Sequence, residues 1–269
     1  MSINMNKPIS VITINLNNKD GLERTINSFL NQTMHGKVEY IVVDGESQDG
    51  SKDILEKYQS HIDIISIEKD KGIYDAMNRG IVLAKGDYTY FLNSGDEFKH
   101  TGVLERIIKI IELTDRKYNV IGGEVDMYRE NGTFYSISDL YPWLPHPGTF
   151  VKSDRLKFYQ FDESFKIYGD MDLFCRMKKA DEYTVYYTGE IIANFYLGGR
   201  GNNPRNMLTQ YQDRIYYSVK NNFFFQVPIV TVTFAVNFIL YKLFGEQVFQ
   251  EFNLKIKDIK VAVKKMIKW

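Results

Sequence analysis

Apolar and polar positions follow two periods along the first 120 residues. Short, continuous apolar runs are typical of strands buried on both faces, and they predict strands at 9–16, 38–44, 62–67 and 87–93. Apolar residues spaced three or four apart predict helices at 20–31, 50–59, 73–84 and 102–113, the first with Asp20 as its N-cap. Strands that alternate with helices in this way predict a parallel sheet covered on both faces.

After residue 118 the pattern changes. The runs "YNVIGGEVDMY" and "TFYSIS", separated by Glu130, Asn131 and Gly132, predict a β-hairpin. A proline-rich stretch, "YPWLPHPG", leads into "HPGTFVK", and a helix is expected over 170–180. Two short strands are expected over 183–196. This mixed pattern distinguishes the second half of the chain from the regular alternation of the first.

Polar side chains follow each predicted strand of the first half. Ligands of parallel sheets bind outside the carboxyl ends of the strands, so we expect these side chains to share one crevice. They are Asn17, Asp44, Glu68, Asp70, Lys71, Asn93 and Asp96. Each one alone is ordinary turn chemistry, since turns favour Asp and Asn. As a set they favour a binding site.

Composition excludes several classes of protein. The 269 residues carry a formal net charge of zero, which does not favour a bulk nucleic-acid binder. The single cysteine, Cys175, excludes an internal disulfide and fits a reducing compartment. The first apolar run is short and broken by polar residues, unlike a signal peptide. We therefore expect a cytoplasmic protein.

Four segments carry a resemblance to a known family. They are "PISVITINLNNKDGLERTINSFLNQT", "EYIVVDGESQDGS", "DKGIYDAMNRGIVLAKGDYTYFLNSGD" and "FDESFKIYGDMDLFCRM". Together, over residues 8 to 200, they resemble the inverting glycosyltransferases of family 2. The resemblance implies the GT-A fold, a Rossmann-like α/β fold with a mixed, mostly parallel sheet flanked by helices. It implies a catalytic domain over 1–205, with a nucleotide-sugar half to about 120 and an acceptor half over 121–205.

The resemblance places a metal ligand at Asp96. A cation held by carboxylates neutralises the charge of a departing diphosphate, and Mn²⁺ or Mg²⁺ prefers such oxygen ligands. Asn93 and Gly95 stand where many members have Asp. With fewer acids, metal binding should depend more on the substrate phosphates. The alternative for Asp96 is a plain strand-end turn.

The resemblance also implies the donor site, for which a UDP-sugar is the expected ligand. Asp44 takes the position that reads the nucleotide base, although Gly45 replaces a second acid found in many members. Thr13 and Asn17 resemble residues that line the base pocket, and Thr13 is alternatively only a β-former in a strand.

Three further residues are expected near the diphosphate. Asp70 and Lys71 precede a helix whose N-terminal amides favour anions, though Lys71 is equally explained as a solvated lysine. Arg200, in the glycine-rich "LGGRG", is expected to clamp the diphosphate when that loop closes.

Asp170 is the predicted catalytic base. Inversion requires a carboxylate on the acceptor side that takes a proton from the attacking hydroxyl. Gly169 replaces an acid often found in this motif, and Asp172 is expected to support or cap the helix. The alternative is that Asp170 only caps that helix. His146 is expected on the acceptor side or near the diphosphate, or else as a structural loop histidine.

The segment 206–269 is expected to be helical. Residues 221–241 carry no charge, and the tail 253–269 combines an apolar helical stripe with six lysines and one acid. This tail favours a helix lying on an anionic membrane surface, on the inner face of the cell membrane. Such contact would suit a glycan or polyprenyl-linked acceptor in bacterial surface polysaccharide synthesis. A helical subdomain or an oligomer contact is the alternative.

Other functions are compatible with part of the pattern. A non-catalytic nucleotide-sugar-binding or membrane-scaffolding protein would tolerate the changes at Asn93, Gly95 and Gly169. A sugar nucleotidyltransferase would need a glycine- and lysine-rich loop after the first strand, and "NLNNKDG" has one glycine and one lysine. A dehydrogenase is not favoured, because no G-x-G-x-x-G follows that strand.

Overall fold

The computed structural model describes residues 7–129, 132–138, 145–197 and 204–245. The chain divides into two compact units, Met1–Gly198 and Gly199–Trp269. The first unit contains the predicted strand-end residues, and the second contains helices.

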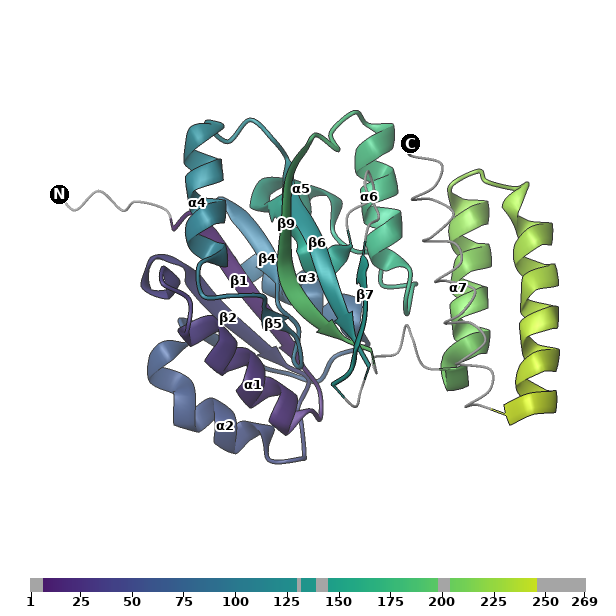
Figure 1. Ribbon diagram of the computed structural model, residues 1–269, viewed down its shortest axis with the longest axis horizontal. Helices are drawn as coiled ribbons and strands as arrows, with labels where there is room; N and C mark the ends of the chain where they lie inside the picture. The colour runs from purple at the N-terminus through teal and green to yellow at the C-terminus, as the bar shows by residue number, and fades with distance from the viewer. Residues whose placement is uncertain (1–6, 130–131, 139–144, 198–203, 246–269) are drawn as a thin grey trace. The chain divides into compact units, whose positions relative to one another are not determined.

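A nine-stranded sheet forms the first unit, in the order β3-β2-β1-β4-β8-β6-β9-β5, with β7 beside β6 (Figure 1). The strands are β1 (Ile9–Asn15), β2 (Glu39–Asp44), β3 (Ile64–Ile67), β4 (Tyr88–Phe91), β5 (Glu97–Phe98), β6 (Val120–Tyr128), β7 (Phe134–Ser138), β8 (Thr149–Lys152) and β9 (Val185–Tyr196).

Strand direction decides where the strand ends meet. The strands β1 to β4 pair in parallel. Strand β8 is antiparallel to both β4 and β6, and β6 is parallel to β9. It follows that β1–β4, β6 and β9 all end at the same edge of the sheet. The predicted mixed, mostly parallel sheet is confirmed.

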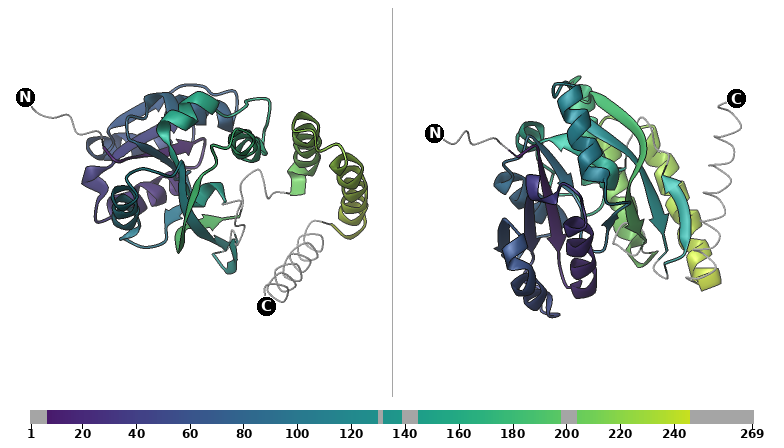
Figure 2. Two further views of the ribbon diagram at one scale, coloured as in Figure 1. Left: turned by 90° about the horizontal axis from the view of Figure 1, so that it is seen from above. Right: turned by 60° about the vertical axis from the view of Figure 1, so that its left-hand side comes forward.

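Helices cover both faces of this sheet (Figures 1 and 2). One face carries α1 (Lys19–Leu30), α2 (Ser51–Tyr58) and α4 (Val103–Leu113), and the other carries α3 (Ile73–Leu83), α5 (Ser153–Tyr159) and α6 (Gly169–Lys179). Short 3₁₀ helices lie at His35–Lys37, Gln59–His61, His146–Gly148 and Pro204–Asn206.

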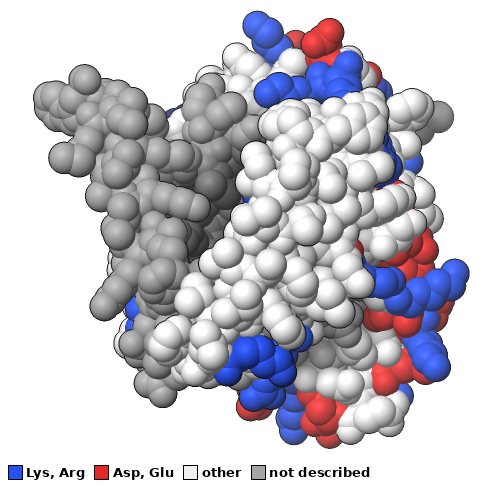
Figure 3. All heavy atoms as spheres, turned by 90° about the vertical axis from the view of Figure 1, so that its right-hand side faces the viewer, with Lys and Arg blue, Asp and Glu red and all other residues white. Residues whose placement is uncertain are grey.

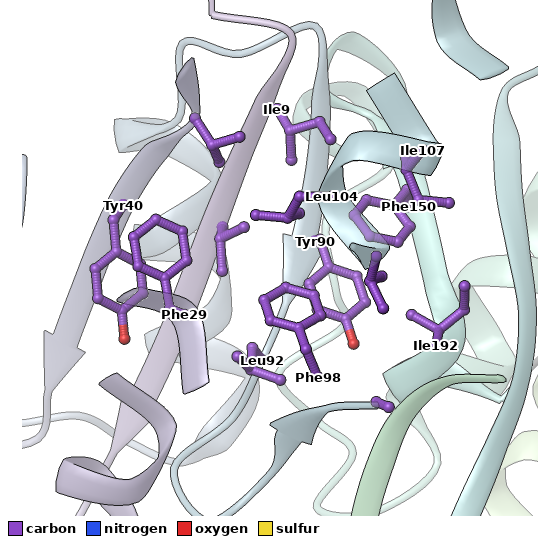
Figure 4. Close-up of a cluster of buried hydrophobic side chains, with 14 of the residues drawn as sticks. Ile9, Phe29, Tyr40, Tyr90, Leu92, Phe98, Leu104, Ile107, Phe150 and Ile192 are labelled. Atoms are coloured by element: carbon purple, nitrogen blue, oxygen red, sulfur yellow. The ribbon is translucent and has the colours of Figure 1, made fainter. Parts of the chain in front are cut away.

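Aromatic rings fill the core between the sheet and the first set of helices (Figure 4). The ring of Phe29 stacks on Tyr40 with centroids 4.0 Å apart, and Tyr90 stacks between Phe98 and Phe150 at 5.3 and 4.2 Å. Full burial of a large apolar side chain stabilises a fold by about 1.5–3 kcal/mol. The first stack packs α1 on β2, and the second joins β4, β5 and β8 to one another.

Two local predictions were wrong, and one short helix was not predicted. Residues 185–196 form one strand rather than two, because the register with β6 shifts at Glu124 and lets the strand continue through Gly189, where φ is +70°. The N-cap of α1 is Asn18, not Asp20, and its side chain accepts the Gly21 N–H at 3.2 Å. The helix α5 was not predicted, because its seven residues are too few for a clear helical period.

The second unit contains α7 (Met207–Lys220) and a helix over Gln226–Gly245. Tyr211 joins them, since its hydroxyl accepts a hydrogen bond from Asn237 Nδ2 at 2.6 Å and its ring lies 5.1 Å from that of Phe234. The 20-residue second helix is long and apolar enough to span a bilayer, which by itself is weak evidence that it does. The predicted basic tail over 253–269 lies outside the described residues.

Candidate active site

Asp44, at the end of β2, is fully buried and hydrogen-bonded inside the protein. Its carboxylate accepts bonds from Asn15 Nδ2 at 2.7 Å and from both the N–H and the hydroxyl of Ser47, each at 2.7 Å. These bonds shape the turn after β2. Direct contact between Asp44 and a nucleotide base stays a prediction, because the described geometry uses both carboxylate oxygens for this turn.

The other two residues predicted for the base pocket differ in position. Thr13 is fully buried within β1, where its hydroxyl donates to the Leu92 carbonyl at 2.8 Å and so joins β1 to the end of β4. Asn17 is exposed at the tip of β1, and its Oδ1 accepts the Gln48 N–H at 2.8 Å. Of these two side chains, Asn17 is the exposed one.

Asp70 lies against the turn after β2. A Cβ atom added to Gly45 would stand 2.2 Å from Asp70 Oδ2 and 3.1 Å from a Leu16 methyl group. A side chain at position 45 would therefore displace the Asp70 carboxylate. The carboxylate of Asp70, from the β3–α3 loop, thus lies where a side chain at position 45 would be. Lys71 follows with an exposed side chain, and its N–H donates to Asp75 Oδ2 at 3.0 Å.

Asp96 lies just beyond the end of β4, with 5% of its surface exposed. Burial raises the pKa of Asp96 to about 8, against the lowering effects of a hydrogen bond from the Tyr196 N–H and of the charge of Arg24. Asn93, in the same turn, has a buried Oδ1 without a hydrogen-bond partner among the described residues. A buried carboxylate and an unsatisfied amide oxygen are both ligands that a hard divalent cation accepts.

These two groups fit a cation held jointly with a ligand. The described part of the chain has no cluster of three or more His, Cys, Asp or Glu side chains arranged to hold a metal ion. A Mg²⁺ or Mn²⁺ ion at Asp96 would therefore need further oxygen ligands, which diphosphate groups and water supply.

Two side chains beside Asp96 had not been predicted. Arg24, on α1, donates to the Gly95 carbonyl at 3.2 Å, and its guanidinium carbon lies 5.0 Å from the centre of the Tyr196 ring. The Tyr196 hydroxyl donates to Glu97 Oε2 at 2.8 Å. No sequence pattern links Tyr196 to Glu97, which is 99 residues away. The helical position of Arg24, three residues after Gly21, could have pointed to the strand tip.

Asp170 lies in the first turn of α6, where its Oδ1 accepts the Met171 N–H at 2.9 Å. Burial raises the pKa of Asp170 to about 6, against the lowering effect of that bond. The helix begins one residue earlier, with Tyr168 as its N-cap, so Asp170 is not the N-cap residue itself. A carboxylate with a pKa near 6 is ionised at neutral pH and is more basic than an ordinary one.

The residue before Asp170 is held by α3. Tyr74 donates its hydroxyl to the Ile167 carbonyl at 2.7 Å and accepts the Gly169 N–H at 2.8 Å. A Cβ atom at position 169 would stand 2.7 Å from the Tyr74 ring. The glycine at this position, where the family often has an acid, is therefore a packing requirement. The hydrogen bonds of Tyr74 also connect the segment before Asp170 to α3, the helix that follows Asp70 and Lys71.

His146 and Asp172, which were predicted on the acceptor side, both contact other side chains of the protein. The ring of His146 lies 5.3 Å from Phe91 and 5.8 Å from Phe161, and burial lowers its pKa to about 4, so it is neutral at physiological pH. Asp172 is fully buried, and its carboxylate accepts a bond from Arg176 Nε at 2.8 Å. This contact between Asp172 and Arg176 lies within α6 and supports that helix.

Most of the predicted residues come together at the carboxyl edge of the sheet. Asn17, Asp44 and Asp70 surround the turn after β2, and Asn18, at the start of α1, donates to the Ser94 carbonyl at 3.0 Å. Through Tyr74, the same region reaches the start of α6. The predicted clamp residue Arg200 lies outside the described residues.

Comparison with known sequences shows the family. The profile of glycosyl transferase family 2 matches residues 10–183, and the chain belongs to this family.

Individual relatives match over shorter stretches. The chain is 40% identical over 103 residues to an uncharacterized glycosyltransferase of Mycobacterium tuberculosis, which covers 38% of this chain and 39% of the relative. It is 38% identical over 94 residues to the putative teichuronic acid biosynthesis glycosyltransferase TuaG of Bacillus subtilis, covering 34% and 37%. The chain thus spans about two fifths of the length of these curated relatives.

Solved structures share the fold. The mannosyltransferase PcManGT from Pyrobaculum calidifontis, in complex with GDP-Man and Mn²⁺, matches with a TM-score of 0.65 at 12% identity, over 96% of this chain and 81% of that one. TarS of S. aureus, in complex with UDP-GlcNAc, matches with a TM-score of 0.61 at 18% identity, over 78% and 65%. The GT-A fold is thereby confirmed.

Proposed function

We propose that this chain is an inverting, metal-dependent glycosyltransferase. It moves a sugar from a nucleotide-diphosphate sugar to a hydroxyl group of a glycan or lipid-linked acceptor, in the synthesis of a bacterial surface polysaccharide. The observation that carries the proposal is a pair of acids with raised pKa values, Asp96 at the edge of the sheet and Asp170 at the start of α6. They supply the two groups that this reaction requires, a cation ligand and a base.

Asp170 is the proposed base. The acceptor hydroxyl gives its proton to the Asp170 carboxylate while its oxygen forms a bond to the anomeric carbon of the sugar. The bond from that carbon to the diphosphate oxygen breaks, and the electron pair leaves with the nucleoside diphosphate. Attack from the face opposite the leaving group inverts the anomeric centre. The family membership and the raised pKa of Asp170 support this assignment.

Asp96 and Asn93 are the proposed protein ligands of Mg²⁺ or Mn²⁺. The bound cation would neutralise the negative charge that grows on the departing diphosphate. The exposed amine of Lys71 is proposed to meet the same diphosphate, since it follows Asp70 at the entry to α3. The UDP complex of TarS supports a UDP-sugar as the donor, and the GDP-Man complex of PcManGT names the main competitor.

The donor can be identified by binding. Nucleotide sugars and Mn²⁺ are added singly and together, and the melting temperature is measured. A ligand that binds the folded state raises the melting temperature by mass action, so the preferred donor should raise it most, and only with Mn²⁺ present. If no nucleotide sugar raises the melting temperature at saturating concentration, the proposed function is wrong.

We further propose that the second unit attaches the enzyme peripherally to the inner face of the cell membrane. The helix over Gln226–Gly245 exposes a row of large apolar side chains, with exposed fractions of 59% for Ile229, 64% for Val232, 50% for Val236 and 71% for Leu243. On this side, the part that Figure 3 shows has a broad area without charged side chains, with both basic and acidic side chains at its edges. Apolar patches of this kind commonly mark contact with a membrane or a protein.

Vesicle binding distinguishes these partners. Val232 and Val236 are changed together to Ser, and Leu113→Ser, an apolar position that is 76% exposed on α4, is the matched control. The double variant should bind less to anionic vesicles in a sedimentation assay, and the control should bind normally. If the double variant binds normally and instead loses self-association, the surface is an oligomer contact.

A further inference from the structure

The segment Ser94–Glu97, which carries Asp96, is held on one side by the first helix. The Gly95 N–H donates to Thr25 Oγ1 at 2.9 Å, and the Thr25 hydroxyl donates to the Asp96 carbonyl at 2.8 Å. Asn18 Nδ2 donates to the Ser94 carbonyl at 3.0 Å. These contacts act on the backbone, so they fix the path of the chain and leave the direction of the Asp96 carboxylate to other groups.

Strand β9 supplies those other groups through its last residue, Tyr196. The backbone N–H of Tyr196 lies near the Asp96 carboxylate and acts to lower the pKa of that acid. Its hydroxyl donates to Glu97 Oε2 at 2.8 Å, which holds the neighbouring carboxylate. Tyr196 therefore lies beside two adjacent acids, near Asp96 through its backbone and bonded to Glu97 through its hydroxyl, although it is distant from both in the sequence.

Arg24 connects the two sides. Its guanidinium lies over the Tyr196 ring, 5.0 Å from the centroid, and Arg24 Nη2 donates to the Gly95 carbonyl at 3.2 Å. A guanidinium over an aromatic ring is attracted by about 0.5–2 kcal/mol, which favours one orientation of both groups. The positive charge also lies near Asp96 and compensates part of its negative charge. Arg24, Tyr196 and the Ser94–Glu97 segment therefore form one connected unit.

We propose that Tyr196 is a positioning residue for the cation site, acting together with Arg24. Its hydroxyl restrains Glu97 and its N–H orients Asp96, so that the Asp96 carboxylate meets the donor-bound cation in one orientation. This inference rests on the proposed function, because it assumes that Asp96 holds the cation. It adds that the last strand of the acceptor half sets the affinity of the donor half for its metal.

The test measures Mn²⁺ binding directly. Mn²⁺ is titrated into the full chain with saturating UDP, and free Mn²⁺ is followed by its electron paramagnetic resonance signal. Tyr196→Phe and Arg24→Gln should each weaken Mn²⁺ binding by about tenfold, at the lower end of the range for groups that orient a metal ligand. UDP binding in EDTA, measured by calorimetry, should stay unchanged in both variants.

The control is a second tyrosine on the same strand. The Tyr187 hydroxyl donates to Glu124 Oε1 at 2.7 Å, so Tyr187→Phe removes the same kind of bond near the other end of β9. This variant should bind Mn²⁺ normally. If Tyr196→Phe lowers the melting temperature but binds Mn²⁺ as tightly as the unaltered protein, the residue is only structural and the inference is wrong. If the unaltered protein itself binds no Mn²⁺ with UDP, the proposed function fails first.

Discussion

Asp44 and Asp96 are both buried acids that follow parallel strands, yet their surroundings differ. The Asp44 carboxylate receives three hydrogen bonds, from Asn15 and Ser47. Asp96 has a strongly raised pKa, because burial outweighs the groups that favour its charge. A buried carboxylate whose oxygens accept hydrogen bonds from the protein stabilises the local fold. A buried carboxylate whose negative charge is only partly compensated is better suited to binding an external cation. Two acids with the same burial and the same position after a strand can therefore differ in how well the protein compensates their charge.

Asp170 extends the comparison and gives the largest expected effect. Like Asp96 it has a pKa raised by burial, but we assign it a proton rather than a metal. Asp170→Asn should lower kcat by about 10²–10⁴-fold, because general base catalysis typically contributes that much. Nucleotide-sugar binding, measured by calorimetry, should stay near normal. Substantial transfer by the variant would show that another group takes the proton.

Asp96→Asn should separate function from stability. Mn²⁺-dependent UDP affinity should fall by about 100-fold or more, beyond the usual effect of changing a group that only orients a ligand. The metal-free variant should nevertheless melt at a higher temperature at pH 7. Because the pKa of Asp96 is raised, the folded state binds more protons than the unfolded state between about pH 4 and 8. The free energy of unfolding therefore falls as pH rises through this range, and a neutral Asn avoids this loss.

The same variant has a clear failure criterion. Affinity measured with and without Mn²⁺ should become equal when Asp96 is replaced. If the difference between the two conditions persists, the cation is held elsewhere and the contrast with Asp44 loses its functional meaning.

The pH dependence of transfer should report Asp170. A base acts in its ionised form, so activity should be constant above about pH 6 and fall roughly tenfold for each pH unit below it. The measurement is kcat from pH 4.5 to 8 with saturating donor and Mn²⁺. A decline that begins only near pH 4 would assign the base to an ordinary, solvated carboxylate.

Asp44→Asn is expected to have the smallest effect on metal binding and a moderate one on folding. The amide NH₂ would face donors where a carboxylate oxygen now accepts, and a lost buried partner costs about 1–3 kcal/mol. The free energy of unfolding, measured in urea, should fall by that amount, while Mn²⁺ affinity stays unchanged. A large loss of Mn²⁺ affinity would mean that Asp44 and Asp96 act on the same cation.

Local sequence patterns predicted the parts of the site that depend on short-range order. The apolar runs before Asp44 and Asp96 located the strands, and parallel strands must place their ends along one edge. The position of Asp70 against Gly45 could not be predicted, because it depends on how the β3–α3 loop packs on the turn after β2. The contact of Tyr196 with Asp96 depends on the antiparallel pairing of β5 with β9, which no local pattern encodes.

The direction of β9 has a consequence for where the working domain ends. The family profile stops at residue 183, before β9 begins. The backbone N–H that lies near the Asp96 carboxylate belongs to Tyr196, the last residue of β9. The chain must therefore extend thirteen residues past the profile match, to Tyr196, before Asp96, the proposed cation ligand, gains this neighbour. A growing chain that stops short of β9 would already contain β1 to β4 and would lack this contact with Asp96.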